Sequence, residues 1–233
     1  MKKQIVEFKV EGDTLRGTLF VPEGKGPFPA VIFFHGSGGV GDTHFEAAEA
    51  IANKGIIGFA FNYRGCGISD GIFEEQTVEM GIADGKAAVL FLLFSPLVDK
   101  ERVGFYGGSF GGYIAAMLCN KFKVKSLALT APAAYSLNVM NIQRDDDSQL
   151  DIGFEKSDSY REIEKFTGNF LLSICELDDC LPKGMAEEYF DVATSAKRKE
   201  QFILKGAYHA ISPQPISRKE IKEKLIDWFS KML

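Results

Sequence analysis

The feature that most constrains this chain is a regular exchange between strand-like and helix-like patterns. Short apolar runs of the buried-strand type are separated, from about residue 29 onward, by stretches with helical periodicity. Parallel strands need a crossover between them, so this alternation predicts an α/β fold with a mostly parallel, doubly wound sheet and helices on both faces. We expect strands at residues 4–10, 14–20, 29–34, 57–62, 102–106, 126–130, 170–174 and 201–204. We expect helices at residues 42–53, 77–94, 109–121, 182–196 and 217–232.

One stretch, at about residues 133–168, breaks the alternation. It is polar, contains three consecutive aspartates at 145–147 and has only short apolar patches. It could be a solvated crossover connection or a small lid over a site at the strand ends, and we favour the lid because long loops in compact domains are usually functional. We therefore predict one domain, residues 1–233, with this insertion. Five apolar side chains of the segment could line a pocket or form a small core: Tyr135, Leu137, Met140, Phe154 and Tyr160.

The composition and charge of the chain argue against several classes of function. The chain has 233 residues, of which 45% are hydrophobic, enough for one sizeable core, and its net charge is −5. Without a run of like charges it carries no electrostatic footprint for nucleic acid or an anionic membrane. Neither a signal-peptide core nor an apolar run of membrane-spanning length is evident. We expect a cytoplasmic protein with a small-molecule partner, and the oligomeric state stays open.

The cysteines and histidines do not form metal motifs. The cysteines have neither zinc spacing nor a Cys-x-x-Cys pair, so we expect reduced, buried thiols. No two histidines lie three to five residues apart, which disfavours a histidine-built metal site. We therefore expect no metal and no organic cofactor. The residues concerned are Cys66, Cys119, Cys175, Cys180, His35, His44 and His209.

A glycine-rich stretch follows the strand expected at 102–106: Gly-Gly-Ser-Phe-Gly-Gly at 107–112. A serine in a sharp strand-to-helix turn has a positive φ angle and needs neighbours without side chains. Gly107 and Gly111 would give that clearance, while Gly108 and Gly112 would let the turn and helix pack closely. The pattern therefore predicts that Ser109 is a nucleophile held in a strained turn.

A serine nucleophile needs a base, and the base needs an orienting carboxylate. His209 follows the last expected strand, which puts it at the same sheet edge as Ser109. Three carboxylates follow the preceding strand, and we choose Asp178 first, Asp179 second and Glu176 third. The two that are not used would be solvated loop residues.

An oxyanion needs two backbone N–H donors. We expect them from Phe110, directly after the serine, and from Ser37, in the glycine-rich bend after the strand at 29–34. That bend could instead hold a phosphate, but no Gly-Lys-Ser/Thr follows it. His35, at the start of the bend, is interpreted as a packing and hydrogen-bonding residue rather than a second base.

Five motifs together resemble the α/β-hydrolase fold over nearly the whole chain. They are His-Gly-Ser-Gly-Gly at 35–39, Asn-Tyr-Arg-Gly-Cys-Gly-Ile-Ser-Asp at 62–70, Gly-Gly-Ser-Phe-Gly-Gly at 107–112, Glu-Leu-Asp-Asp-Cys-Leu-Pro at 176–182 and Gly-Ala-Tyr-His at 206–209. Within that superfamily the chain is similar to small serine esterases related to dienelactone hydrolases and to the catalytic domains of prolyl-oligopeptidase-type peptidases. The resemblance implies Asp178, four residues before Pro182, as the acid, and the Ser37 and Phe110 amides as oxyanion donors.

The chain also departs from these families. Dienelactone hydrolases usually have a cysteine nucleophile where this chain has Ser109, and Cys175 replaces the usual glycine or histidine before the acid loop. There is no room for the propeller of prolyl-oligopeptidase-type enzymes, which disfavours a peptidase. We expect a serine hydrolase that cleaves carboxylic esters of small to medium acyl or aryl substrates through an acyl-enzyme.

Three alternatives stay open: an amidase or aminopeptidase, an acyl thioesterase, and a non-catalytic binding member of the fold. A histidine base ordinarily loses its proton near pH 6.5, so catalysis should increase between about pH 6 and 7.5.

Overall fold

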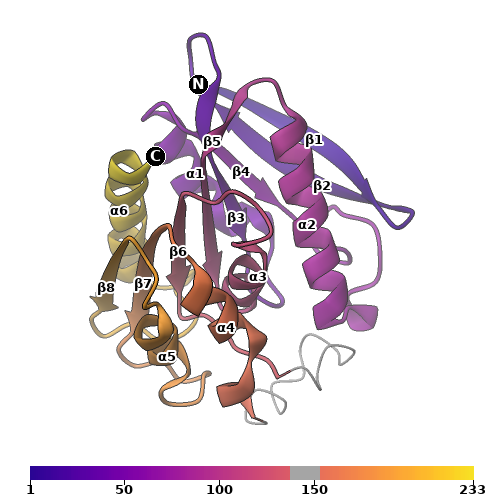
Figure 1. Cartoon of the computed structure of the whole chain (residues 1–233). Coiled ribbons are helices and arrows are strands. Elements are labelled where there is room, and N and C mark those ends of the chain that lie inside the picture. Colours follow the sequence, from indigo (N-terminus) through magenta and orange to yellow (C-terminus); the bar gives the residue numbers. More distant parts are fainter. Residues whose placement is uncertain (137–152) are drawn as a thin grey trace.

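A computed structural model describes residues 1–136 and 153–233 (Figure 1). In these ranges the strands form one sheet with the order β1-β2-β4-β3-β5-β6-β7-β8. β1 and β2 form an antiparallel hairpin, β2 pairs antiparallel with β4, and the remaining pairings are parallel. The predicted α/β fold class is confirmed. The strands are β1 Lys2–Val10, β2 Asp13–Val21, β3 Phe28–Phe34, β4 Ile57–Phe61, β5 Val98–Gly108, β6 Ser126–Thr130, β7 Asn169–Cys175 and β8 Arg198–Leu204.

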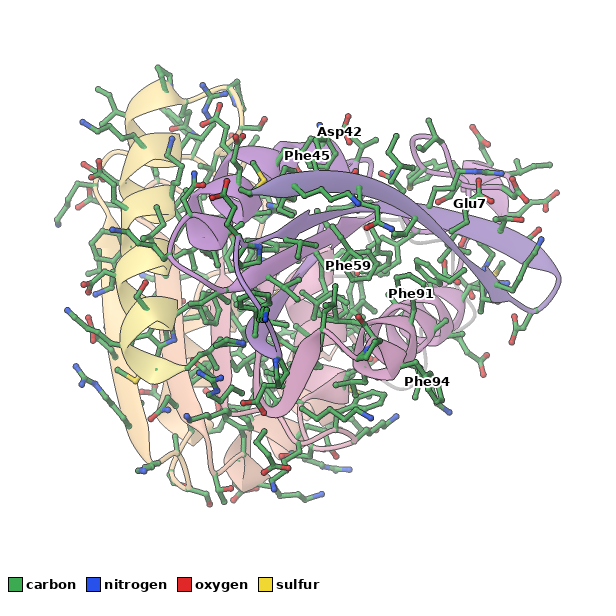
Figure 2. All side chains as sticks on the ribbon, turned by 90° about the horizontal axis from the view of Figure 1, so that it is seen from above. Glu7, Asp42, Phe45, Phe59, Phe91 and Phe94 are labelled. Atoms are coloured by element: carbon green, nitrogen blue, oxygen red, sulfur yellow. The ribbon has the colours of Figure 1, made fainter. Side chains whose placement is uncertain are left out.

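Helices cover both faces of the sheet (Figure 1). They are α1 Phe45–Ala52, α2 Val78–Phe94, α3 Phe110–Leu118, α4 Asp158–Lys165, α5 Met185–Val192 and α6 Pro215–Met232, with short 3-10 helices η1 Gly41–His44, η2 Phe73–Glu75 and η5 Phe154–Lys156. Neighbouring side chains of the central strands point to opposite faces, as the pleat requires: Phe34 packs in one core cluster and Phe33 in the other. Seen from above, Phe45 of α1 and Phe91 of α2 lie on opposite sides of the sheet (Figure 2).

The segment expected as a polar insertion contains a helix that the sequence patterns did not predict. α4 begins after Ser157, whose hydroxyl accepts the Ser159 amide as an N-cap, and its buried side chains include Tyr160 and Ile163. The helix contacts α3 and α5. With only two large apolar residues in eight, it is too short for a clear helical period.

The five apolar residues considered for this segment have different outcomes. Tyr135 and Tyr160 are buried in the core, and Phe154 packs against it, so the core interpretation holds for these three. Leu137 and Met140 lie outside the described residues. Whether the segment acts as a lid stays a prediction.

The parallel part of the sheet sets the place of the site. Parallel strands end at a common edge, and the loops after β3, β5, β6, β7 and β8 all leave from it. These loops carry the residues selected from the sequence. In residues 1–136 and 153–233 no helix is both long and apolar enough to cross a membrane.

Candidate active site

Ser109 occupies a sharp turn between β5 and α3. Its φ is 51° and its ψ is −124°, a region that residues with a side chain rarely adopt. A Cβ on Gly107 would lie 2.2 Å from the Gly111 carbonyl oxygen, and one on Gly111 would lie 2.1 Å from the Phe34 carbonyl oxygen. Backbone atoms cannot yield to such contacts, so the predicted clearance role of the two glycines is confirmed.

The other two glycines of the stretch differ from each other. A Cβ on Gly112 would come within 2.8 Å of the Pro132 side chain, as close packing predicts. A Cβ on Gly108 would meet its nearest neighbour, the Thr130 carbonyl oxygen, at 3.6 Å, an ordinary contact. The packing role expected for Gly108 is therefore wrong.

Three side chains from distant parts of the sequence form one chain of hydrogen bonds. The His209 Nε2 atom lies 2.9 Å from the Ser109 hydroxyl, and its Nδ1 atom lies 2.8 Å from Asp178 Oδ2. The Asp178 and His209 side chains are 17% and 14% exposed. Because the pair is mostly shielded from water, solvent weakens the interaction between the two side chains only a little. The arrangement orients one ring nitrogen toward a carboxylate and the other toward a hydroxyl.

Asp178 is held in its ionised form. Burial acts to raise the pKa of this carboxyl, but the hydrogen bond from His209 and the amides of Leu181 and Cys180 outweigh burial, and the pKa lies below its ordinary value. Both amides donate to Oδ1, at 2.9 and 3.0 Å, which leaves Oδ2 for the histidine. The loop after β7 thus fixes the direction of the carboxylate.

The two other candidate carboxylates are exposed, as the sequence predicts for loop residues, but each also makes hydrogen bonds across the site. Asp179 Oδ1 accepts the backbone N–H of His209 at 3.2 Å. Glu176 accepts the Gly206 amide at 2.8 Å and pairs with Lys205 at 2.6 Å. Both therefore connect the loop after β7 to the loop that carries the histidine.

Sequence reasoning missed Gln214, whose carboxamide closes the histidine loop. Its Oε1 accepts the Tyr208 amide at 3.1 Å, and its Nε2 donates to the carbonyls of Tyr208 and Ala210, at 3.0 and 2.7 Å. These bonds bracket His209 on both sides. The only local signal is that Gln214 precedes Pro215, the first residue of α6, and this signal says nothing of its side-chain partners.

The loop after β3 borders the serine. His35 is fully buried; its Nδ1 lies 2.8 Å from the Gly36 carbonyl oxygen, and its Nε2 accepts the Tyr63 amide at 3.3 Å, in line with the structural role expected. Asn62 holds the same loop, because its Oδ1 accepts the Gly41 amide at 2.7 Å. Ser37 borders the cavity beside Ser109, and Phe110 opens α3 directly after it.

A cavity of about 530 Å³ opens beside Ser109 and His209. Its described walls come from the loop after β3, from η1 and α1, from the ends of β5 and β6, and from α6 with the loop before it. Tyr135, Phe154 and Tyr160 do not border this cavity, which agrees with the core alternative for these three residues.

The thiols agree with the expectation in part. All four cysteines are reduced thiols, and Cys66, Cys119 and Cys175 are buried, but Cys180 is exposed in the loop after Asp178. Within residues 1–136 and 153–233, no group of three or more His, Cys, Asp or Glu side chains is placed to hold a metal ion.

Comparison with known proteins identifies the family. The family model described as the alpha/beta hydrolase fold matches residues 29–168, more than half of the chain. The chain belongs to this family. The match begins at β3, which lies at the centre of the sheet, and includes the elbow that holds Ser109.

Individual members of the family support hydrolase activity. The chain is 37% identical to the thiohydrolase aneE of Aspergillus aculeatus over 113 residues. The aligned residues cover 47% of this chain and 35% of aneE. The chain is 28% identical to the esterase EstD of Thermotoga maritima over 137 residues. The aligned residues cover 53% of this chain and 31% of EstD. The structure of Est1E from Butyrivibrio proteoclasticus with ferulic acid bound superimposes with a TM-score of 0.76 and 18% identity, covering 97% of this chain and 98% of the other. At this identity the structural likeness shows the fold alone.

Proposed function

We propose that the protein is a serine hydrolase that cleaves carboxylic esters of small to medium acyl or aryl substrates through an acyl-enzyme. The observation that carries the proposal is the continuous chain of hydrogen bonds from Ser109 through His209 to Asp178. A hydroxyl in contact with an imidazole, itself oriented by a carboxylate, is the arrangement that makes serine nucleophilic.

The reaction would proceed in two halves. In the first, the Ser109 oxygen bonds to the ester carbonyl carbon, His209 Nε2 takes the hydroxyl proton, and the same proton passes to the leaving alcohol as the ester bond breaks. In the second, water attacks the acyl-enzyme, His209 accepts a proton from the water, and Ser109 recovers it as the acid departs. Asp178 keeps the Nδ1 proton facing the carboxylate and stabilises the imidazolium in both halves.

The oxyanion of each tetrahedral intermediate would be bound by the backbone amides of Ser37 and Phe110. Support comes from their position: Ser37 borders the cavity next to Ser109, and Phe110 is the first residue of α3, where helix amides face outward. Removing one oxyanion donor elsewhere costs about a hundredfold to a thousandfold in rate.

An ester substrate is favoured by the relatives and by the cavity. EstD is an esterase by name, and Est1E was solved with ferulic acid, an aryl carboxylic acid. A cavity of about 530 Å³ is large enough for a medium-sized acyl or aryl group. We propose a small-molecule ester as the partner and retain the cytoplasm as the proposed location.

The test is hydrolysis of p-nitrophenyl esters of increasing acyl length by wild type, Ser109→Ala and Asp178→Asn. Wild type should turn over, Ser109→Ala should lose about a thousandfold or more in kcat, and Asp178→Asn about a hundredfold or more. Glu176→Gln is the matched control and should stay within about tenfold of wild type. Equal rates for wild type and Ser109→Ala would contradict the proposal.

Thioester hydrolysis is a second candidate, favoured by the 37% identity to the thiohydrolase aneE. The same residues would act, with a thiol as the leaving group. An oxygen ester and a thioester of the same acyl group distinguish the two activities when kcat/KM is divided by the uncatalysed rate of each compound. An esterase should have the higher value on the oxygen ester, and a thioesterase should have it on the thioester.

A further inference from the structure

The floor of the cavity contains polar groups that the proposed reaction does not use. We call the side chains of His44, Tyr106 and Thr130 the polar floor. All three border the cavity that contains Ser109. Thr130 ends β6 directly opposite Gly108, and its carbonyl accepts the Ser109 amide at 3.1 Å, so the polar floor adjoins the nucleophile.

Two buried atoms of the polar floor, His44 Nε2 and Thr130 Oγ1, make no hydrogen bond of ordinary length to the described residues, and the Thr130 hydroxyl lies near that of Tyr106. Thr130 is only 3% exposed, and Ser173, its register neighbour on β7, also has a buried hydroxyl without a described partner. Buried polar groups in proteins are nearly always hydrogen-bonded, because leaving one unpaired costs free energy. Two such atoms, His44 Nε2 and Thr130 Oγ1, belong to residues at one cavity and point to a partner that comes from outside the protein.

The protonation of the floor defines which partner it would accept. Burial lowers the pKa of His44 to about 4 and raises that of Tyr106 to about 12, so both are neutral near pH 7. The other ring nitrogen of His44 bonds the Phe34 carbonyl, which requires a proton there and leaves Nε2 as an acceptor. The ring is held in place by stacking on Phe33, at 5.6 Å, and by the edge of Tyr106, at 5.3 Å.

The floor and its apolar neighbours favour an uncharged ligand group. Six apolar side chains also border the cavity: Val40, Ala47, Ala131, Ile211, Ile221 and Leu225. The cationic side chains that border the cavity, Arg218 and Lys222, face Glu46 of α1, at 3.9 and 3.1 Å. The three floor side chains are uncharged near pH 7, so a carboxylate or an ammonium bound directly at the floor would have no counter-ion among them; Asp42 and Glu46 border the cavity elsewhere. A hydroxyl can donate to His44 Nε2 and accept from Thr130 at no charge cost.

We propose that the polar floor is a subsite for a hydroxyl group on the acyl or aryl part of the substrate, so that the enzyme prefers hydroxylated esters over their deoxy analogues. This inference rests on the proposed ester hydrolysis and names its substrate class. The apolar side chains that border the cavity would hold the carbon skeleton while the floor pairs with the hydroxyl. Binding sites that hydrogen-bond a substrate hydroxyl reject the analogue without it, because their own buried groups then stay unpaired.

The experiment compares kcat/KM for two matched pairs of methyl esters. The aryl pair is 3-(4-hydroxyphenyl)propanoate and 3-phenylpropanoate, and the alkyl pair is 6-hydroxyhexanoate and hexanoate. Wild type should prefer the hydroxylated member of at least one pair by about tenfold, the value of one good hydrogen bond. The pair that responds shows whether an aryl or an alkyl skeleton carries the group. Equal values within both pairs would overturn the inference.

Two variants remove floor atoms with little change of shape. Thr130→Val replaces the hydroxyl by a methyl group and should lower the preference at least threefold, with no fall in Tm because that hydroxyl makes no hydrogen bond of ordinary length to the described residues. His44→Phe retains the stacking on Phe33 and should lower the preference likewise. Ser212→Ala, at an exposed position on the rim of the same cavity, is the matched control and should leave it unchanged. A preference unaffected by both floor variants would contradict the subsite.

Failure of this inference is distinguishable from failure of the proposed function. An enzyme that hydrolyses both members of each pair at equal rates retains its esterase function and loses only the hydroxyl subsite. A protein that hydrolyses none of the four compounds and does not react with a fluorophosphonate at Ser109 loses both.

Discussion

Two regions meet at the hydrogen bond between Ser109 and His209, and they are built in different ways. The elbow around Ser109 is positioned by backbone atoms: two glycines lie where a Cβ would be little more than 2 Å from a carbonyl oxygen. The histidine loop, residues 205–214, is positioned by side chains, with Gln214, Asp179 and Glu176 bonded to its backbone. A close-packed backbone tolerates almost no added side-chain atom, so one substitution in the elbow should have a large effect. The histidine loop is held by several hydrogen bonds, so the loss of each one should have a smaller effect.

The largest effect should come from Gly111→Ala. Its Cβ would lie 2.1 Å from the Phe34 carbonyl oxygen and 2.6 Å from that of His35, so β3 and α3 would have to separate. We expect a loss of roughly 3 kcal/mol or more in the free energy of unfolding, or no folded protein. Chemical denaturation measures it, and Gly108→Ala, with no contact closer than 3.6 Å, should stay within about 1 kcal/mol of wild type. Equal stability of the two variants would contradict backbone positioning of the elbow.

The histidine loop should respond more gradually, as Gln214→Ala would show. The variant loses three hydrogen bonds to the residues on either side of His209. We expect kcat on a p-nitrophenyl ester to fall about tenfold with little change in KM, and the free energy of unfolding to fall by about 1–2 kcal/mol. Gln201→Ala, at an exposed position on β8, is the control. Unchanged kcat in Gln214→Ala would show that the loop is held without the carboxamide.

A smaller effect is expected for Asp179, which makes one bond to the His209 amide. Asp179→Ala should lower kcat about threefold, and Asp179→Asn, which keeps a carbonyl acceptor, should restore it. Steady-state kinetics of the two variants measure the difference. A larger loss in Asp179→Asn than in Asp178→Asn would contradict this assignment and would mean that Asp179 orients the histidine ring.

The smallest effect concerns acid stability. The pKa of Asp178 is lower in the folded protein than in the unfolded chain, because the His209 bond and two amides outweigh burial. Its contribution is therefore complete above the ordinary aspartate pKa of about 3.9 and is lost as the pH falls through the lower folded value. Tm measured between pH 5 and 2.5 should fall more steeply for wild type than for Asp178→Asn. Parallel curves would contradict the shift.

The same contrast explains what the sequence could predict. The elbow is a local backbone problem, so the spacing of Gly107, Ser109 and Gly111 carries it, and the alternation of strands and helices predicts the edge where His209 and Asp178 lie. Even there, Gly108 was misjudged, because the open space beside its Cβ depends on where β6 ends.

The hydrogen bonds of the histidine loop and the walls of the cavity could not be predicted from the sequence. The bonds of Gln214 and Asp179 to the backbone around His209 depend on how two loops and a helix meet, and no spacing records it. The cavity walls combine the adjacent elements η1 and α1 with α6, which begins more than 150 residues later in the chain. The positions of Thr130 Oγ1 and His44 Nε2 in the polar floor depend on the folded sheet, so no sequence pattern predicts them.

We propose above all that Ser109 is a nucleophile activated by His209. A fluorophosphonate that reacts only with activated serines tests it directly, with mass spectrometry of the labelled peptides from wild type and from folded Ser109→Ala. We expect one label per chain on wild type, at Ser109, and none on Ser109→Ala. A wild type that does not label, or a Ser109→Ala variant that labels equally, would contradict it.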